Sequence, residues 1–209
     1  KTMQAQIKKK DTYKMGIDTL FNLRRQLMQT LVSFKEDLCR EDFNAIPFIN
    51  ADGYHSKTIA YSIWHIFRIE DIVAHTVITE DEQVFFTGNY QVRINSPIIT
   101  TGNELVKQQI ADFSKQLNLE ELYSYIFEVR ESTEKILERF SYDELKWKIP
   151  DERKGYLKSL NVVNCDEKAI WLIDYWCNKD ICGLIQMPFS RHWIMHTEAC
   201  LRIKNKMHS

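Results

Sequence analysis

Apolar residues recur at helical spacing in several long stretches of this chain, and that period limits the fold more than any other feature of the sequence. The first stretch covers residues 11–38, and its apolar positions share one helical face: Ile17, Leu20, Leu23, Leu27, Leu31 and Phe34. Similar patterns predict helices over residues 56–78, 119–140, 166–186 and 188–207, and a shorter helix over 103–115. We therefore predict an all-α protein.

Residues that break helices are scarce, because the chain has only 6 Gly and 4 Pro. They fall between the predicted helices, as at Asp52-Gly53 and at Met187-Pro188, and Pro188 suits the first turn of the last helix. A length of 209 residues fits one domain. We predict a single domain over residues 1–209, an antiparallel up-down four-helix bundle with additional short helices and long connecting loops.

Charge and composition exclude several classes of protein. The formal charge is −1, from 28 basic and 29 acidic residues, which disfavours binding to a nucleic-acid backbone. No apolar run approaches the ~20 residues that span a bilayer, and the N-terminal KTMQAQIKKK lacks the apolar stretch of a secretory signal. Five cysteines without paired spacing predict reduced thiols. We expect a cytoplasmic protein that binds neither nucleic acid nor membrane.

Two histidines lie four residues apart in the last predicted helix, within SRHWIMHTE at 190–198. At about 100° per residue, His192 and His196 project within about 40° of each other. Phe189 and Ile203 lie on the same side, so both imidazoles are predicted to face the interior. An unsatisfied polar group is costly there, so each ring needs a partner.

The predicted helix over 56–78 places a third histidine at the edge of its buried face. His65 projects beside Ile69, in a strip of apolar positions. His75 instead groups with Arg68 and Asp71 on the opposite side of the helix. We therefore predict that His65 points inward and that His75 points outward.

Three inward histidines on two helices form a candidate metal site. Three imidazoles that leave one coordination position open can activate water or a thiol at a divalent ion. The alternative is that the histidines are packed and hydrogen-bonded in the core, as a single buried histidine usually is. Tyr61 and Tyr175 are candidates for the wall of a pocket, but aromatic residues on bundle helices usually belong to the core. They are therefore assigned to the core, as are Trp171, Trp176 and Trp193.

Two motifs resemble those of a known family. WHIFRIED at 64–71 resembles the histidine-bearing signature of the DinB/YfiT-like superfamily, and RHWIMHTEACLRI at 191–203 resembles its last-helix HxxxH motif. The likeness covers most of the chain, in the number and order of helices and in the placement of both motifs. It implies a four-helix bundle with a metal held by three histidines, which here would be His65, His192 and His196.

The resemblance also implies a class of reaction. Some members are metal-dependent transferases or isomerases that use low-molecular-weight thiols such as bacillithiol or mycothiol. We therefore expect a small-molecule substrate, with such a thiol as a candidate partner. Zinc or nickel is the first expectation for the metal, and iron and copper also accept histidine ligands. The chain departs from compact members at 79–101 and 146–165, where long loops would alter substrate access.

Two further residues extend this hypothesis. Glu70 projects among apolar residues of its predicted helix and is a candidate general base, although a salt bridge at the helix edge is the simpler interpretation. Cys200, one turn after His196, is a candidate fourth ligand, because thiolate suits zinc. A site closed by Cys200 would be structural and would lack the open position that catalysis needs.

The sequence thus predicts a thiol-dependent S-transferase or a hydrolase that acts on a small molecule at a three-histidine metal site. The alternative is a non-catalytic helical stress or interaction protein whose histidines are packed or hold a structural metal. Bundles of this kind often pair through helix faces, so a homodimer is also expected, although no residue of the sequence fixes the interface.

Overall fold

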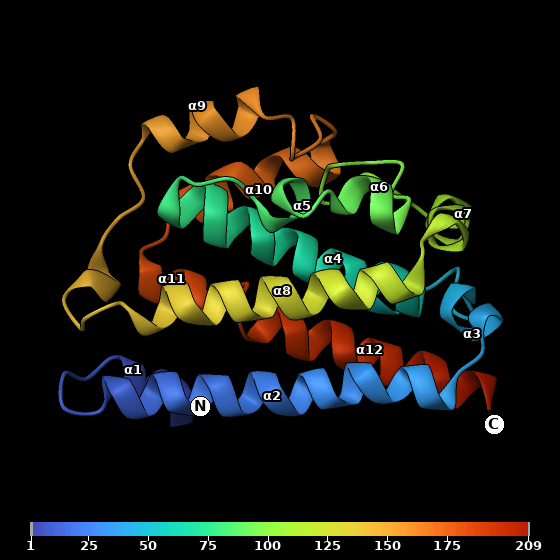
Figure 1. The fold of residues 1–209 in the computed structure, drawn as a ribbon, viewed down its shortest axis with the longest axis horizontal. Helices are drawn as coiled ribbons and strands as arrows, with labels where there is room; N and C mark the ends of the chain where they lie inside the picture. Colours follow the sequence, from blue (N-terminus) through green and yellow to red (C-terminus); the bar gives the residue numbers. More distant parts are fainter. Residues whose placement is uncertain (1, 209) are drawn as a thin grey trace.

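The computed structural model describes residues 2–208, and within them all regular elements are helices, without a β-strand. The prediction of an all-α protein is confirmed. The longest elements lie side by side along the length of the molecule (Figure 1): α2 (Tyr13–Asp37), α4 (Ile59–Asp71), α8 (Leu119–Glu138) and α12 (Arg191–Met207). Their bounds follow the predicted periodic stretches closely.

The four long helices contact one another in a closed ring. Helix α4 contacts α8 and α12, and α2 also contacts α8 and α12. In Figure 1, α2 and α12 run from left to right, whereas α4 and α8 run from right to left. The expected up-down alternation therefore fails between α4 and α8. The segment from 80 to 118 returns the chain along the molecule before α8 begins, so these two helices run in the same direction.

Shorter helices fill the connections. They are α1 (Thr2–Ile7), α3 (Arg40–Asn44), α5 (Val84–Thr87), α6 (Tyr90–Ile94), α7 (Gln108–Gln116), α9 (Glu152–Ser159), α10 (Glu167–Cys177) and α11 (Ile181–Gln186), with 3₁₀ turns at Gly53–His55 and Glu144–Lys146. The helix predicted over 166–186 is thus two helices. The break is stable because the Asp180 carboxylate accepts a hydrogen bond from the Gly183 amide at 2.7 Å and caps α11. Pro188 precedes α12 and does not occupy its first turn.

Helix α4 is the centre of the molecule, because every one of its residues is buried. It contacts α3, α5 and α7 as well as α8 and α12. It continues beyond Asp71 as a π-helix, Ile72–Thr79, which ends at Glu80 in the left-handed conformation with φ 60°. The connection between α4 and α8, which includes α5 and α7, covers the part of α4 that does not pack against α8 and α12.

This burial corrects the prediction that Arg68, Asp71 and His75 face outward. Arg68 and Asp71 are 0% exposed and His75 is 6% exposed. Asp71 accepts hydrogen bonds from the amides of Val84 and Phe85 at 2.9 and 2.8 Å, at the start of α5. Periodicity identified the more apolar face of α4 correctly, but these partners come from a distant segment that folds over the other face.

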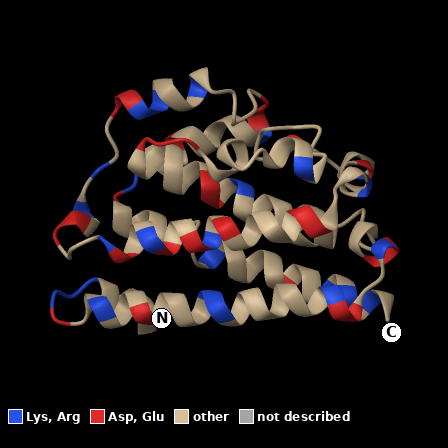
Figure 2. Cartoon of the chain, in the orientation of Figure 1, with Lys and Arg blue, Asp and Glu red and all other residues tan. Residues whose placement is uncertain are grey.

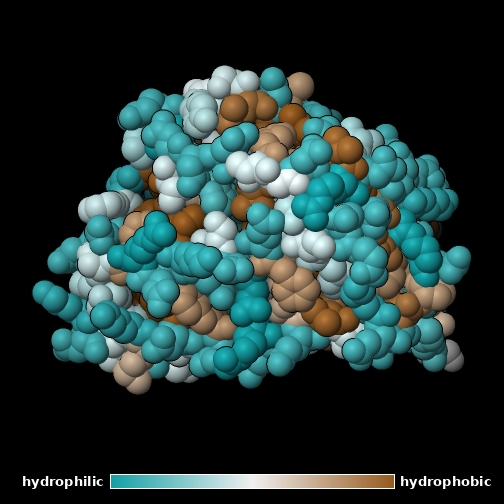
Figure 3. Space-filling model, in the orientation of Figure 1, coloured by the Kyte–Doolittle hydropathy of each residue, from teal (hydrophilic) through white to brown (hydrophobic). Residues whose placement is uncertain are grey.

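The surface carries both signs of charge, and basic and acidic residues are interspersed along the helices (Figure 2). The face shown in Figure 3 is mostly hydrophilic, with hydrophobic residues scattered between. Among residues 2–208, no helix combines the length and the apolar composition that a membrane span requires.

Replacing Asp71 with Ala should lower the free energy of unfolding by about 3 kcal/mol. The change leaves the Arg68 guanidinium, 3.7 Å from the Asp71 carboxylate, and two α5 amides buried without their acceptor. Urea unfolding followed by circular dichroism measures the effect. Asp112→Ala, on the exposed side of α7, is the control and should change the free energy by less than about 0.5 kcal/mol. Equal losses in the two variants would contradict a structural role for Asp71.

Candidate metal centre

Three histidines from α4 and α12 converge inside the molecule. His65 lies on α4, and His192 and His196 lie one turn apart on α12, as the HxxxH spacing predicts. Their ring centroids are 4.6–5.1 Å apart, and one ring nitrogen from each lies within 4.8 Å of the others. The three side chains are 2–6% exposed. The structure therefore brings together three buried histidines close enough to hold one metal ion.

The hydrogen bonds of these rings leave nitrogens free for such an ion. Nδ1 of His65 donates to the Thr101 carbonyl oxygen at 2.6 Å, which leaves Nε2 with its lone pair. Nδ1 of His192 and Nδ1 of His196 are buried and have no hydrogen-bond partner among the described residues. Buried imidazoles that are merely packed are expected to be hydrogen-bonded. The three imidazoles therefore fit a divalent metal as a set of nitrogen donors.

Burial keeps the three imidazoles neutral at neutral pH. It lowers the pKa of His65 to about 4 and holds the pKa of His192 and His196 well below their usual value. The positive charge that each ring would carry also disfavours protonation of its neighbours. Neutral imidazole is the form that binds metal, so no proton has to be displaced from these rings.

Three side chains of α4 bind carbonyl groups within residues 99–102, in the connection from α4 to α8. Tyr61 donates to Gly102 at 2.9 Å, His65 to Thr101 at 2.6 Å, and Arg68 to Ile99 at 2.7 Å. Gly102 has φ +76°, and a Cβ there would lie 2.8 Å from the Trp64 ring. A side chain at this position would thus displace the carbonyl that orients His65. Sequence reasoning did not assign this segment, because its carbonyl groups carry no residue-type signal.

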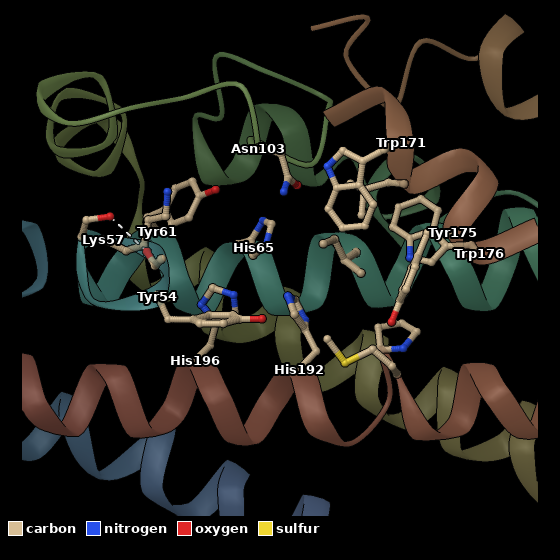
Figure 4. A pocket seen from close by; sticks show the side chains of 16 residues that line it. Tyr54, Lys57, Tyr61, His65, Asn103, Trp171, Tyr175, Trp176, His192 and His196 are labelled. Carbon is tan, nitrogen blue, oxygen red and sulfur yellow. Dashed lines mark hydrogen bonds between the residues drawn. The ribbon is translucent and has the colours of Figure 1, made fainter. Parts of the chain in front are cut away.

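A cavity of about 360 Å³ opens beside the histidines (Figure 4). Tyr61 stacks on His65 with ring centroids 5.2 Å apart, and Tyr54 contacts His196 edge-on at 4.7 Å. Trp171, Tyr175 and Trp176 from α10 add three further aromatic rings to the wall. The assignment of Trp171 to the core is wrong, because this side chain is 49% exposed. The volume suits a small molecule.

Sequence reasoning also missed two polar residues of this cavity, Lys57 and Asn103. The one sequence feature that could have identified Lys57 is its position just before α4, a helix whose residues are all buried. Asn103 follows Gly102, whose carbonyl group accepts a hydrogen bond from Tyr61, and no sequence pattern marks Asn103 as a cavity residue. Both line the same cavity although they are 46 positions apart in the sequence, so their proximity depends on the tertiary structure.

Glu70 lies elsewhere in the core and does not line the cavity. Its carboxylate accepts two hydrogen bonds from the Arg24 guanidinium, at 2.7 and 2.9 Å, and one from the Trp193 indole at 2.7 Å. Arg24 and Glu70 are both 0% exposed. The structure thus places Glu70 in a buried ion pair and gives it no contact with the histidines that a general base would need.

Cys200 is also separate from the histidine cluster. Among the described residues, the group that could hold a metal contains only the three histidines. Burial raises the pKa of the Cys200 thiol to about 12, so it stays protonated. Cys200 packs in the hydrophobic cluster that includes Trp64 and Ile203.

No protein-family model and no curated protein matches this chain. The resemblance to the DinB/YfiT-like superfamily therefore depends on the two histidine motifs and on the arrangement of the helices.

Replacing Glu70 with Ala should lower the free energy of unfolding by about 3 kcal/mol, because the buried Arg24 would lose its bidentate partner and keep only the partly exposed Glu134 as a counter-ion. Chemical denaturation measures the change. Glu131→Ala, an exposed residue of α8, is the control and should cost less than about 1 kcal/mol. A Glu70 variant as stable as the wild type would contradict a structural role for Glu70 and would make it a candidate general base again.

Replacing Cys200 with Ser should leave the metal content per folded chain unchanged, because the thiol lies outside the histidine cluster. Elemental analysis of the purified variant beside the wild type measures this. Loss of the metal from a variant with an unchanged circular dichroism spectrum would instead support a closed, structural site.

Proposed function

We propose that this protein is a metal-dependent enzyme of the DinB/YfiT-like type, with a divalent ion bound by His65, His192 and His196. The convergence of three buried, neutral imidazoles on a cavity carries the proposal. The ring of contacts among α2, α4, α8 and α12 supports assignment to a four-helix bundle, with the parallel pair α4 and α8 as a departure from simple alternation. Zinc and nickel are the first candidates for the ion.

The composition of the cavity favours thiol transfer over hydrolysis. When bound by three neutral ligands, a divalent ion lowers the pKa of water or of a thiol at its open position. Among residues 2–208, no Asp or Glu lines the cavity, so none of these carboxylates is placed to remove a proton from water during hydrolysis. A thiol has an intrinsic pKa of about 8.5 and needs less help to ionise. We therefore propose an S-transferase that delivers a low-molecular-weight thiol to a small electrophile.

The chain's own residues position and shield the reaction. Thr101 fixes the ring orientation of His65 through its carbonyl group. Tyr54 and Tyr61 pack against the histidine rings and restrict water on that side. The aromatic wall from α10 supplies apolar surface for a substrate.

The alternative function is a non-catalytic helical module with packed histidines. Under this alternative, the convergence of three neutral imidazoles beside a cavity has no role. A homodimer that pairs through helix faces stays a prediction under either function.

Elemental analysis tests the metal site directly. The purified, tag-free protein should hold about one divalent ion per chain after reconstitution, and the His65→Ala/His192→Ala variant should hold none. Saturation at about 100 times the dissociation constant should stabilise the wild type by about 2.7 kcal/mol. His208→Ala, at the exposed end of α12, is the control and should retain the ion. A wild-type protein that neither holds nor is stabilised by zinc, nickel, iron or copper would refute the proposal.

A further inference from the structure

The cavity beside the histidines has two chemically different ends. In Figure 4, Lys57 and Tyr54 lie at one end, Trp171 and Trp176 lie at the other, and the three histidines lie between them. A molecule that fills the cavity therefore meets a cationic end and an aromatic end, with its middle beside the candidate metal.

The cation at one end has no counter-ion. Lys57 is half-buried, its Nζ lies 5.4 Å from the centroid of the Tyr61 ring, and it forms no ion pair with any described residue. No Asp or Glu of the described part of the chain lines the cavity and balances this charge. Burial lowers the pKa of Lys57, because the charged form is only partly solvated. An anionic ligand would supply the missing partner.

The opposite end presents flat apolar surface. Trp171 and Tyr175 lie one turn apart on α10, with ring centroids 5.5 Å apart, and Trp176 adds a third ring. Aromatic rings prefer offset or edge-to-face contact with other rings. Between the two ends, Asn103 points toward His65 (Figure 4), and its Oδ1 is buried without a partner. A polar group in the middle of the ligand could hydrogen-bond to this amide.

We propose that the cavity binds a small amphipathic carboxylic acid, with the carboxylate at Lys57 and an aromatic body against Trp171, Tyr175 and Trp176. A single ammonium group matches a monoanionic carboxylate better than a phosphate, which usually takes several donors. The inference that the middle of this ligand reacts beside the histidines rests on the proposed function. The assignment of Lys57 as the residue that selects the anion rests on the cavity alone.

A pair of matched probes tests this assignment. Isothermal titration calorimetry on the zinc-loaded full chain would compare 3-phenylpropanoate with its neutral isostere 3-phenylpropanamide. We expect the acid to bind about tenfold more tightly than the amide, which is ~1.4 kcal/mol. Lys57→Met should remove this preference by weakening the acid alone, and Lys57→Arg should keep most of it. Lys146→Met, an exposed lysine outside the cavity, makes the same change in charge and should leave the preference intact. Propanoate, which lacks the ring, should bind more weakly than 3-phenylpropanoate.

The outcomes separate this inference from the metal site. Equal binding of acid and amide to the wild type, or binding of neither, would overturn the inference even if elemental analysis finds the metal. A preference for the acid that survives in Lys57→Met would also overturn it, because the carboxylate would then be recognised by another group, such as the ion. A Lys57-dependent preference in a protein that holds no metal would support the inference while refuting the proposed function.

Discussion

The buried ion pair between Arg24 and Glu70 joins the three helices on which the site depends. Arg24 comes from α2 and Glu70 from α4, and the Trp193 indole of α12 donates to the same carboxylate at 2.7 Å. A buried ion pair is stable only when its remaining hydrogen-bonding groups are satisfied, and Arg24 also donates to the Phe189 carbonyl oxygen and to Glu134. These contacts fix the rotation of α12 against α4. His192, the residue before Trp193, is thereby held toward His65.

The connection between α4 and α8 completes the site from the other side. It covers the polar face of α4, supplies amides to Asp71, and presents three carbonyl groups from residues 99–102 to Tyr61, His65 and Arg68. The orientation of one candidate metal ligand is thus tied to the packing of a loop, and the glycine at 102 is needed for that packing. A sequence change in this loop would act on His65 through the Thr101 carbonyl.

The electrostatics of the cavity are unusual for a buried space. Three neutral imidazoles and a half-buried lysine line it, and no Asp or Glu among the residues that the structure describes does so. A divalent ion would add further positive charge. This excess of positive charge accounts for both proposed preferences, because a bound thiolate and a bound carboxylate would each neutralise part of it.

The sequence by itself determined the helical class, the long helices and the inward direction of His65, His192 and His196, because helical periodicity records which face of a helix is apolar. It failed at Asp71 and His75, since periodicity cannot show that a distant segment covers the other face of α4. It identified Glu70 as a carboxylate among apolar residues, but only the tertiary structure paired it with Arg24 and Trp193. The cavity and Lys57 were likewise decided by the tertiary structure, because a space between loops and helices depends on contacts between residues far apart in the chain.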